Sequence, residues 1–451
     1  MTVAIVVYKG LIPVVGRILT MITRDISIED AIIDLLDNSI DGATQINPDN
    51  LNGFIIDIKI DENRLCIKDN CGGFSLERAQ KYAFRFGRPE DAPTINNSVG
   101  RFGIGMKRAL FKMGEKFSVE SQKNQEHFIV NVDVNEWCNK TKQVTSLDGN
   151  PVEIDDWTFN ATILNSQNVD DGTIIEVTDL KEDVKALFGS DDFLNSLYAC
   201  ITKMLCFSLI KGMKITLNNK ALVANSPELF ISENTKPYFI KGEIDGVHYK
   251  IVAGLGRIGE PKLSGWYVFC NNRLVLEGDQ TSLTGWGVNS IPKWHIDYVM
   301  FRGFVFLDSQ ETSKLPLTTT KKGLDASSSI YRKILPHMRN GMIRVISFLK
   351  AITGLKEEAN DYRKLIGDIS DKMNIESIRT YDSETVGERS FIAPELDLQK
   401  IAEKKDTVRV AYDVNKKTAD IAKDNADVSS YKELGKTTFN YYVKMEGIDY
   451  E

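Results

Sequence analysis

The sequence predicts an α+β fold for the first 350 residues, followed by a polar, mainly helical C-terminal region. Helical periodicities and short apolar strand patterns are interspersed over these 350 residues, and no internal repeat orders them. Beyond Lys356 the apolar patterns weaken, and from Asp361 onward 15 Lys or Arg stand against 19 Asp or Glu. These observations favour two folded α+β domains and a less regular tail.

The composition is that of a globular protein with a sizeable core: 42% of the 451 residues are apolar and 26% are charged. A net charge of −7 and a pI of about 5.5 exclude a global basic field that would attract nucleic acid, although a local basic groove stays open. The six cysteines form no CxxC pair, which argues against a zinc ribbon or a disulfide framework. We therefore expect a reducing compartment and a cytoplasmic location.

The N-terminal residues raise the question of a membrane segment. The apolar stretch from Val3 to Ile22 is interrupted by Lys9, Pro13 and Arg17, and no small-residue cleavage site follows it. We therefore expect a packed segment and no membrane partner. A strap exchanged between two protomers is an equally open interpretation of this stretch.

Local patterns predict the elements of the first domain. Residues 28–42 have helical periodicity, and residues 54–60 and 64–67 alternate as a hairpin closed by Asp61-Glu-Asn. Ser75 is expected to cap a helix over 75–84. The further elements, in order, are a polar loop at 87–99, a helix at 107–113, a strand-like region at 117–134 and a strand at 172–178.

The middle of the chain continues with mixed elements. In order, we expect a helix at 193–209, strands at 213–217, 249–253, 266–270 and 303–307, and a helix at 329–355. The expected domains are therefore residues 1–185, residues 186–355 and a C-terminal region at 356–451.

The first chemical motif is Asp34-Leu-Leu-Asp-Asn38-Ser-Ile-Asp41-Gly-Ala43. On a helix, Asp34, Asn38 and Asp41 fall within about 60° of one another. A carboxylate one turn from an amide can orient a water beside Mg²⁺, because the carboxylate accepts the proton of the water while the amide oxygen ligates the metal. A solvated acidic face is the plainer interpretation of this motif alone.

The second motif, Lys68-Asp69-Asn70-Cys71-Gly72-Gly73-Phe74, directly follows an expected strand. An Asp at the end of a strand can accept a hydrogen bond from an exocyclic amine such as that of adenine, and the glycines let a ring lie close to the backbone. Taken alone, the segment is better explained as a tight turn.

The third motif is Gly100-Arg101-Phe102-Gly103-Ile104-Gly105-Met106-Lys107, which opens a helix after a loop. Free backbone N–H groups and the helix dipole can hold phosphate there. The segment is not a Walker A loop, since Met106-Lys107 stands where Lys and then Ser or Thr are needed. Its GxxGxG spacing does not fit a dinucleotide fingerprint either.

In this order and at this spacing, the three motifs resemble those of the GHKL (Bergerat-fold) ATPases. That superfamily includes DNA gyrase B, heat-shock chaperones of the Hsp90 type, MutL, MORC proteins and sensor histidine kinases. The resemblance implies a Bergerat α/β sandwich for the first domain, ATP and Mg²⁺ as ligands, and hydrolysis of ATP to ADP and phosphate.

The resemblance also implies roles for individual residues. Asp34 takes the place of the catalytic glutamate that activates water, Asn38 that of the Mg²⁺ ligand, and Asp41 joins them in the nucleotide site. Asp69 matches the adenine-binding aspartate and Gly73 the glycine beneath the base. In the lid, Gly100, Gly103 and Gly105 wrap the phosphates together with Arg101, Phe102, Ile104, Met106 and Lys107. Thr173 matches a threonine that helps to hold adenine, although an ordinary strand threonine is almost as good an explanation.

Two positions depart from the family pattern. Asp34 is one carbon shorter than glutamate, so its carboxylate lies about 1.5 Å further from the water unless the helix shifts. We therefore expect slow hydrolysis. Cys71 replaces the first glycine of the usual turn, which requires a backbone conformation that admits a Cβ atom.

Two later segments resemble the transducer-like (ribosomal S5-type) second domain of the MORC, MutL and gyrase branch. In Leu315-Pro-Leu-Thr-Thr-Thr-Lys-Lys-Gly, a lysine is expected to reach the γ-phosphate, and we favour Lys321 over Lys322 for this role. A basic surface turn is the alternative. Asn271-Asn-Arg273 resembles the "NxR" strand of that domain. The four histidines all follow the first two motifs, which disfavours a histidine kinase.

The leading functional hypothesis is an ATPase whose ATP-driven lid closure and homodimerisation operate a clamp, with DNA as a candidate partner in repair or defence. A chaperone-like ATPase that acts on protein clients is the first alternative. The second alternative is an ATP-gated interaction module that scarcely hydrolyses its nucleotide, an interpretation that Asp34 keeps open.

Overall fold

The computed structural model describes residues 2–5, 22–85, 105–145, 149–165, 170–257, 260–318, 323–355, 359–382, 388–394, 410 and 412–448. The chain divides into two compact units, Met1–Glu395 and Leu396–Glu451. Within the described ranges, no helix has both the length and the apolar character that a bilayer crossing requires. The α+β class predicted from the sequence is confirmed.

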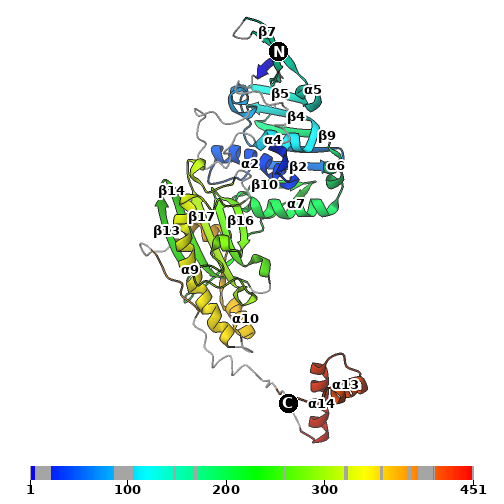
Figure 1. Cartoon of the computed structure of the whole chain (residues 1–451), viewed down its shortest axis with the longest axis vertical. Coiled ribbons are helices and arrows are strands. Elements are labelled where there is room, and N and C mark those ends of the chain that lie inside the picture. Colours follow the sequence, from blue (N-terminus) through cyan, green and yellow to red (C-terminus); the bar gives the residue numbers. More distant parts are fainter. Residues whose placement is uncertain are drawn as a thin grey trace. The chain divides into compact units, whose positions relative to one another are not determined.

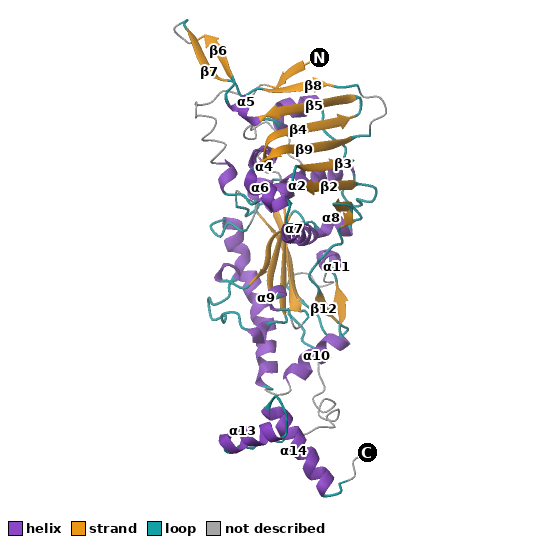
Figure 2. Cartoon of the chain, turned by 90° about the vertical axis from the view of Figure 1, so that its right-hand side faces the viewer, coloured by secondary structure: helices purple, strands orange, loops and turns teal. Residues whose placement is uncertain are grey.

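The first sheet of the Met1–Glu395 unit has nine strands in the described part of the chain, in the order β1-β8-β5-β4-β9-β3-β2-β10-β11. Figure 2 shows β8, β5, β4, β9, β3 and β2 side by side in this order. The strands span Thr2–Ile5 (β1), Ile55–Asp61 (β2), Arg64–Asp69 (β3), Gly114–Lys123 (β4), Glu126–Asp133 (β5), Phe159–Ile163 (β8), Gly172–Leu180 (β9), Lys214–Leu217 (β10) and Lys220–Ala221 (β11). The sheet is mixed, because β10 runs parallel to β2 while β2, β3, β9, β4, β5 and β8 pair antiparallel with their neighbours.

Helices cover the first sheet through their apolar faces. The helix α2 (Ile28–Ile46) begins at Ser27, whose hydroxyl accepts a hydrogen bond from the backbone N–H of Asp30 at 3.2 Å. It packs against α4 and buries Ile32, Leu35 and Leu36 in the core of this sheet. The other helices around this sheet are α3 (Leu76–Arg78), a π-helical turn η1 (Ala79–Ala83), α4 (Gly105–Met113), α5 (Val134–Cys138), α6 (Glu182–Phe188), α7 (Asp191–Met204) and α8 (Cys206–Ile210).

A second sheet follows in the same unit, with the order β13-β14-β17-β15-β16. Its strands are Tyr238–Ile244 (β13), Val247–Leu255 (β14), Gly265–Cys270 (β15), Arg273–Asp279 (β16) and Phe301–Asp308 (β17). The long helix α9 (Ser329–Gly354) packs along β13, β14 and β17, as Figure 1 shows. Smaller elements complete the unit: α10 (Ala359–Ile369), α11 (Ile375–Thr380), the pair β12 (Leu229–Ile231) and β18 (Asp371–Met373), and the hairpin β6 (Thr141–Thr145) and β7 (Pro151–Asp155).

The domain limits differ from those expected from local patterns. The first sheet continues beyond residue 185, since β10 and β11 belong to it and its core includes Leu222. Residues beyond 355 also belong to the first compact unit, because β18 pairs with β12 and Ile375 and Ile378 are buried in a core beneath the second sheet. The physical reason is the same in both cases: the pairing partners lie far away in the sequence.

The N-terminal strand β1 pairs antiparallel with β8 at the edge of the first sheet of its own chain. The expected apolar segment from Val3 to Ile22 therefore begins as an edge strand. Most of the remainder of that segment, residues 6–21, lies outside the described residues.

The C-terminal unit contains α13 (Lys416–Asn425) and α14 (Tyr431–Met445). Ser430 caps α14 through a reciprocal pair of hydrogen bonds with Glu433, so the start of this helix is encoded locally. Ala419 and Val443 are the buried apolar side chains in the described part of this unit, whereas Phe439, Tyr442 and several neighbours are exposed.

Candidate functional site

Asp69, at the end of β3, lies at the centre of a buried hydrogen-bond network. Its Oδ1 accepts hydrogen bonds from the backbone N–H groups of Cys71 at 2.8 Å and Thr173 at 3.2 Å. Its Oδ2 accepts a hydrogen bond from the Ser39 hydroxyl on α2 at 2.7 Å. The antiparallel register of β3 and β9 places Asp69 opposite Thr173. The structure therefore brings together the first and second motifs and the predicted threonine.

The electrostatics of Asp69 follow from its burial. Its relative exposure is 8%, and desolvation raises the pKa of this carboxyl, while the hydrogen bonds from Ser39, Cys71 and Thr173 oppose that rise. An ionised carboxylate has about four acceptor positions, of which the described residues use three. One acceptor position is left for a donor such as an exocyclic amine, so these residues fit adenine.

The turn after Asp69 is shaped by its two glycines. Gly72 and Gly73 have positive φ values of 88° and 52°, whereas Cys71 is buried without adopting this left-handed region. A Cβ atom at Gly73 would lie 2.1 Å from the carbonyl oxygen of Gln122 on β4. The turn therefore admits cysteine at position 71 in place of the usual glycine, because the left-handed backbone angles fall on Gly72 and Gly73.

The opposite end of the site is made of charged groups. Asp34 on α2 is buried, and its Oδ2 accepts a hydrogen bond from Nη2 of Arg108 on α4 at 2.5 Å. Arg273, the first residue of β16, forms an ion pair with Asp37, and its Nη1 lies 3.8 Å from Oδ1 of Asp34. Burial lowers the pKa of Arg273, while Asp34 and Asp30 raise it. Two carboxylates on α2 thus face one guanidinium group from the helix α4 and one from β16 of the second sheet.

The predicted metal ligand is one turn beyond Asp34. Asn38 is exposed, and its side-chain N–H group donates to the backbone carbonyl of Asp34 at 3.0 Å. The amide oxygen of Asn38 is therefore the atom that can ligate a cation, and a single protein oxygen with phosphate oxygens and waters suits Mg²⁺. Among the described residues, no group of three or more His, Cys, Asp or Glu side chains could hold a metal ion. Asp41 is half-buried, and its backbone carbonyl accepts from Gln45.

The predicted phosphate loop lies only partly within the described residues. Gly100, Arg101, Phe102, Gly103 and Ile104 lie outside them, as do Lys321 and Lys322. Gly105 begins α4, and a Cβ atom there would lie 3.5 Å from Oδ2 of Asp34, so the end of the loop adjoins the charged end of the site. Met106 is half-buried.

Lys107, the last residue of the predicted phosphate segment, lies in the first turn of α4. Its ammonium is fully buried and donates a hydrogen bond to the carbonyl oxygen of Ala83 in η1 at 2.6 Å. Burial lowers the pKa of Lys107 to about 7. In this structure, therefore, Lys107 ties the start of α4 to η1.

Sequence reasoning missed four residues of this arrangement as site residues: Ser39, Asp37, Arg108 and Arg273. Ser39 and Asp37 lie inside the first motif, and the structure buries Asp37 one turn after Asp34, so cations must lie opposite these two acids. Arg108 follows the phosphate loop directly. Arg273 carried only the resemblance to a strand motif, and nothing local indicates which acid it meets.

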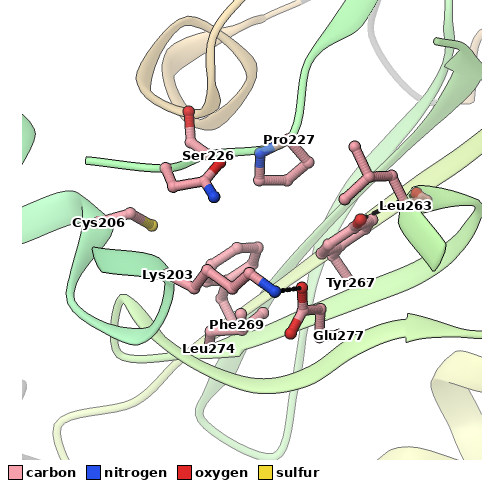
Figure 3. Close-up of a pocket in the computed structure, with 10 residues that line it drawn as sticks. Lys203, Cys206, Ser226, Pro227, Leu263, Tyr267, Phe269, Leu274 and Glu277 are labelled. Atoms are coloured by element: carbon pink, nitrogen blue, oxygen red, sulfur yellow. Dashed lines mark hydrogen bonds and ion pairs between the residues drawn. The ribbon is translucent and has the colours of Figure 1, made fainter. Parts of the chain in front are cut away.

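A pocket elsewhere in the chain is too small for a nucleotide. It lies between α7, α8 and the strands β15 and β16, where Lys203 forms an ion pair with Glu277 at 2.9 Å and the Tyr267 hydroxyl donates to the carbonyl of Leu263 (Figure 3). Its cavity volume is about 30 Å³, which leaves room for water but not for a nucleotide. The candidate site is the Asp34–Asp69 region, where the first two motifs and Thr173 come together.

Residues 26–168 match a family model described as "Histidine kinase-, DNA gyrase B-, and HSP90-like ATPase". The matched region contains all three motifs, and the match supports a GHKL-type ATPase domain and ATP binding for this part of the chain. No curated protein matches the chain.

Proposed function

We propose that this protein binds ATP through the Asp69 network and hydrolyses it slowly with Mg²⁺. The observation that carries the proposal is the buried Asp69 carboxylate, held by Ser39, Cys71 and Thr173, with one acceptor position left for the exocyclic amine of adenine. The donors come from α2, β9 and the turn after β3, so adenine recognition is built into the first sheet.

The proposed roles at the phosphate end follow the motif order. Asp34 accepts the proton of the attacking water, and Asn38 supplies an oxygen to Mg²⁺, which neutralises charge on the phosphates when bound. The Gly100–Lys107 segment closes over the phosphates, and Arg108 lies at its end. Lys321 is proposed as the contact to the γ-phosphate from the second domain.

A second candidate function is an ATP-gated interaction module with little hydrolysis. The observation that favours it is the hydrogen bond between Asp34 and Arg108 at 2.5 Å. A base that is one carbon shorter than glutamate and already bound to a guanidinium is poorly placed to accept a proton from water. Multiple-turnover phosphate release above the level of Asp34→Ala would reject this second candidate.

We further propose that ATP binding drives homodimerisation, so that two copies form a clamp. DNA is the partner of the leading version and a protein client that of the alternative. A DNA clamp should weaken steeply as salt rises, because phosphate contacts release counterions. Binding of a protein client through apolar surface should change little over the same salt range.

The test measures ATP affinity, phosphate release and mass by light scattering in the same samples, for the wild type and for Asp69→Asn. The asparagine oxygen can still accept from the two backbone N–H groups, so the variant should fold, while its amide N–H₂ opposes the adenine amine. We expect nucleotide binding in the wild type, a shift from monomer to dimer with a non-hydrolysable analogue, and loss of both in the variant. A wild-type chain that binds no nucleotide would overturn the proposal.

A further inference from the structure

The hairpin of β15 and β16 delivers Arg273 to the candidate site. Cys270 pairs with Arg273 across a two-residue connection, in which Asn271 and Asn272 have φ values of 47° and 65°. Two consecutive positive φ values define the type I′ turn, and asparagine tolerates them better than most residues. Arg273 is therefore the first residue after a tight turn, where the backbone has little freedom.

The same turn is anchored to its own sheet. Asn271 donates from its backbone N–H to Leu307 at 2.9 Å, and its side chain exchanges two hydrogen bonds with the backbone of Ser309, at 3.0 and 3.1 Å. Asn272 accepts a hydrogen bond from Arg379 on α11 at 3.1 Å. Any movement of the second sheet therefore carries Arg273 with it.

At its other end, Arg273 meets the carboxylates of α2. The relative exposures of Asp34, Asp37 and Arg273 are 2%, 5% and 4%, so little solvent screens their charges. Asp34 and Asp37 lie one turn apart and repel each other. Arg108 neutralises the charge of Asp34, and Arg273 neutralises that of Asp37. Nη1 of Arg273 also lies 3.8 Å from Asp34.

We propose that Arg273 is a positioning residue of the ATPase site. It fixes the carboxylates of α2 from the second domain, so the position of Asp34, the proposed proton acceptor, depends on how that domain packs against α2. The inference rests on the proposed function and extends it by one residue and one mechanism. Without Arg273, Asp37 loses its guanidinium partner and Asp34 loses a second cation 3.8 Å away, so the charge balance of both carboxylates changes. The carboxylate that activates water then shifts, although adenine recognition by Asp69 is untouched.

Arg273→Gln tests this role, since it keeps a polar side chain with the same first carbon atoms but removes the charge and shortens the side chain. We expect kcat to fall by about 10- to 100-fold, the loss that follows displacement of a reacting group by about 1 Å. The dissociation constant for ATP should change by less than about threefold, because the Asp69 end of the site, which is proposed to bind adenine, is intact. Arg273→Lys should recover part of the lost kcat, because it restores the charge without the planar guanidinium.

Arg302 offers a matched control in the same sheet. It is also a buried arginine, but its guanidinium donates to the backbone carbonyls of Val299, Phe301 and Arg257. Arg302→Gln should lower the thermal unfolding temperature as Arg273→Gln does. Unlike Arg273→Gln, it should leave the kcat of the folded protein unchanged.

A double-mutant cycle tests the ion pair itself, without nucleotide. Asp37→Asn and Arg273→Gln should each lower the unfolding temperature, and the double variant should be no less stable than the worse single variant, because both remove one interaction. Additive losses would overturn the pairing, and an active wild type with equal kcat in Arg273→Gln and Arg302→Gln would overturn the positioning role. If the wild type binds no ATP, the proposed function fails, while the cycle still reports on the pair.

Discussion

The two ends of the candidate site hold their carboxylates by different chemistry. At the base end, Asp69 is surrounded by uncharged donors, a serine hydroxyl and two backbone N–H groups, that belong to the first sheet and the helix packed on it. At the phosphate end, Asp34 and Asp37 face the guanidinium groups of Arg108 and Arg273.

This difference separates recognition from turnover. Neutral donors held by α2, β9 and the turn after β3 keep their geometry when a ligand arrives, so the base end is preorganised. Buried ion pairs are sensitive to every charge nearby, and a triphosphate brings several negative charges. Moreover, Arg273 comes from the second sheet, so the phosphate end is complete only when the second sheet is packed against α2. We therefore expect changes at the phosphate end to alter kcat and changes at the base end to alter affinity.

The largest effect is expected from Asp34→Asn. The amide cannot accept a proton from water, so kcat should fall by about 10²- to 10⁴-fold. Affinity for ATP should stay within about threefold, because Asp69 is unchanged. Single-turnover phosphate release beside equilibrium binding measures both quantities. Wild-type turnover in this variant would mean that Asp34 is not the group that accepts the proton of water. It would also contradict the assignment of turnover to the phosphate end and of affinity to the base end.

The Lys107→Met variant tests whether this buried lysine makes the free energy of unfolding depend on pH. The pKa of Lys107 is about 7 in the folded chain and about 10.4 for an unperturbed lysine. Between these values the unfolded chain binds more protons, so this lysine makes the wild type more stable as pH rises. Methionine has no such titration, and from pH 7 to pH 9 the wild type should gain about 2 kcal/mol in unfolding free energy relative to the variant. The prediction would be contradicted if the denaturant midpoints of the wild type and of Lys107→Met changed by the same amount between pH 7 and pH 9.

Ser39→Ala probes the base end by removing one donor to Asp69. The carboxylate keeps the backbone N–H groups of Cys71 and Thr173, so the site should stay formed. We expect ATP affinity to fall by about 3- to 10-fold, which is the worth of one typical hydrogen bond, about 0.7 to 1.4 kcal/mol. The kcat at saturating ATP should remain that of the wild type. A fall in kcat larger than the fall in ATP affinity would contradict the prediction that the base end controls affinity and the phosphate end controls turnover.

The smallest effect is expected from Thr173→Val. Thr173 contacts Asp69 through its backbone N–H, which valine keeps, and the two side chains have nearly the same shape. Affinity should change by less than about threefold in a calorimetric titration. A loss above about tenfold would show that the threonine hydroxyl itself contacts the nucleotide, as the resemblance to the ATPase superfamily implies.

Sequence patterns predicted the elements that depend on neighbouring residues. The α2 helix, the β2–β3 hairpin and the Ser75 cap, whose hydroxyl accepts from Arg78, are confirmed. Other elements were only partly anticipated: the expected helix at 75–84 continues as a π-helical turn, and the one at 193–209 is interrupted at Leu205. Helix periodicity does not report such local changes in winding.

Contacts between distant residues were beyond the reach of local patterns. The glycine motif correctly indicated a helix N-terminus, but the buried hydrogen bond between Lys107 and Ala83 depends on how η1 packs. The ion pair of Arg273 and Asp37 joins β16 of the second sheet to the helix α2, and no periodicity or turn signal in the sequence predicts how these two elements pack. The extension of the first sheet to β10 is of the same kind, since parallel pairing with β2 leaves no mark in either strand.

That extension has a consequence for synthesis of the chain. The Thr216 hydroxyl on β10 donates to Asp57 on β2 across a separation of 159 residues. At typical translation rates of about 5 to 20 residues per second, β2 waits roughly 8 to 30 s for its second neighbour. During that interval an isoleucine-rich strand presents an open edge, the kind of edge that recruits other chains. Ribosome pausing before Leu217 should therefore raise the aggregated fraction of newly made protein, and a shortened chain that keeps the first sheet has to extend past this strand.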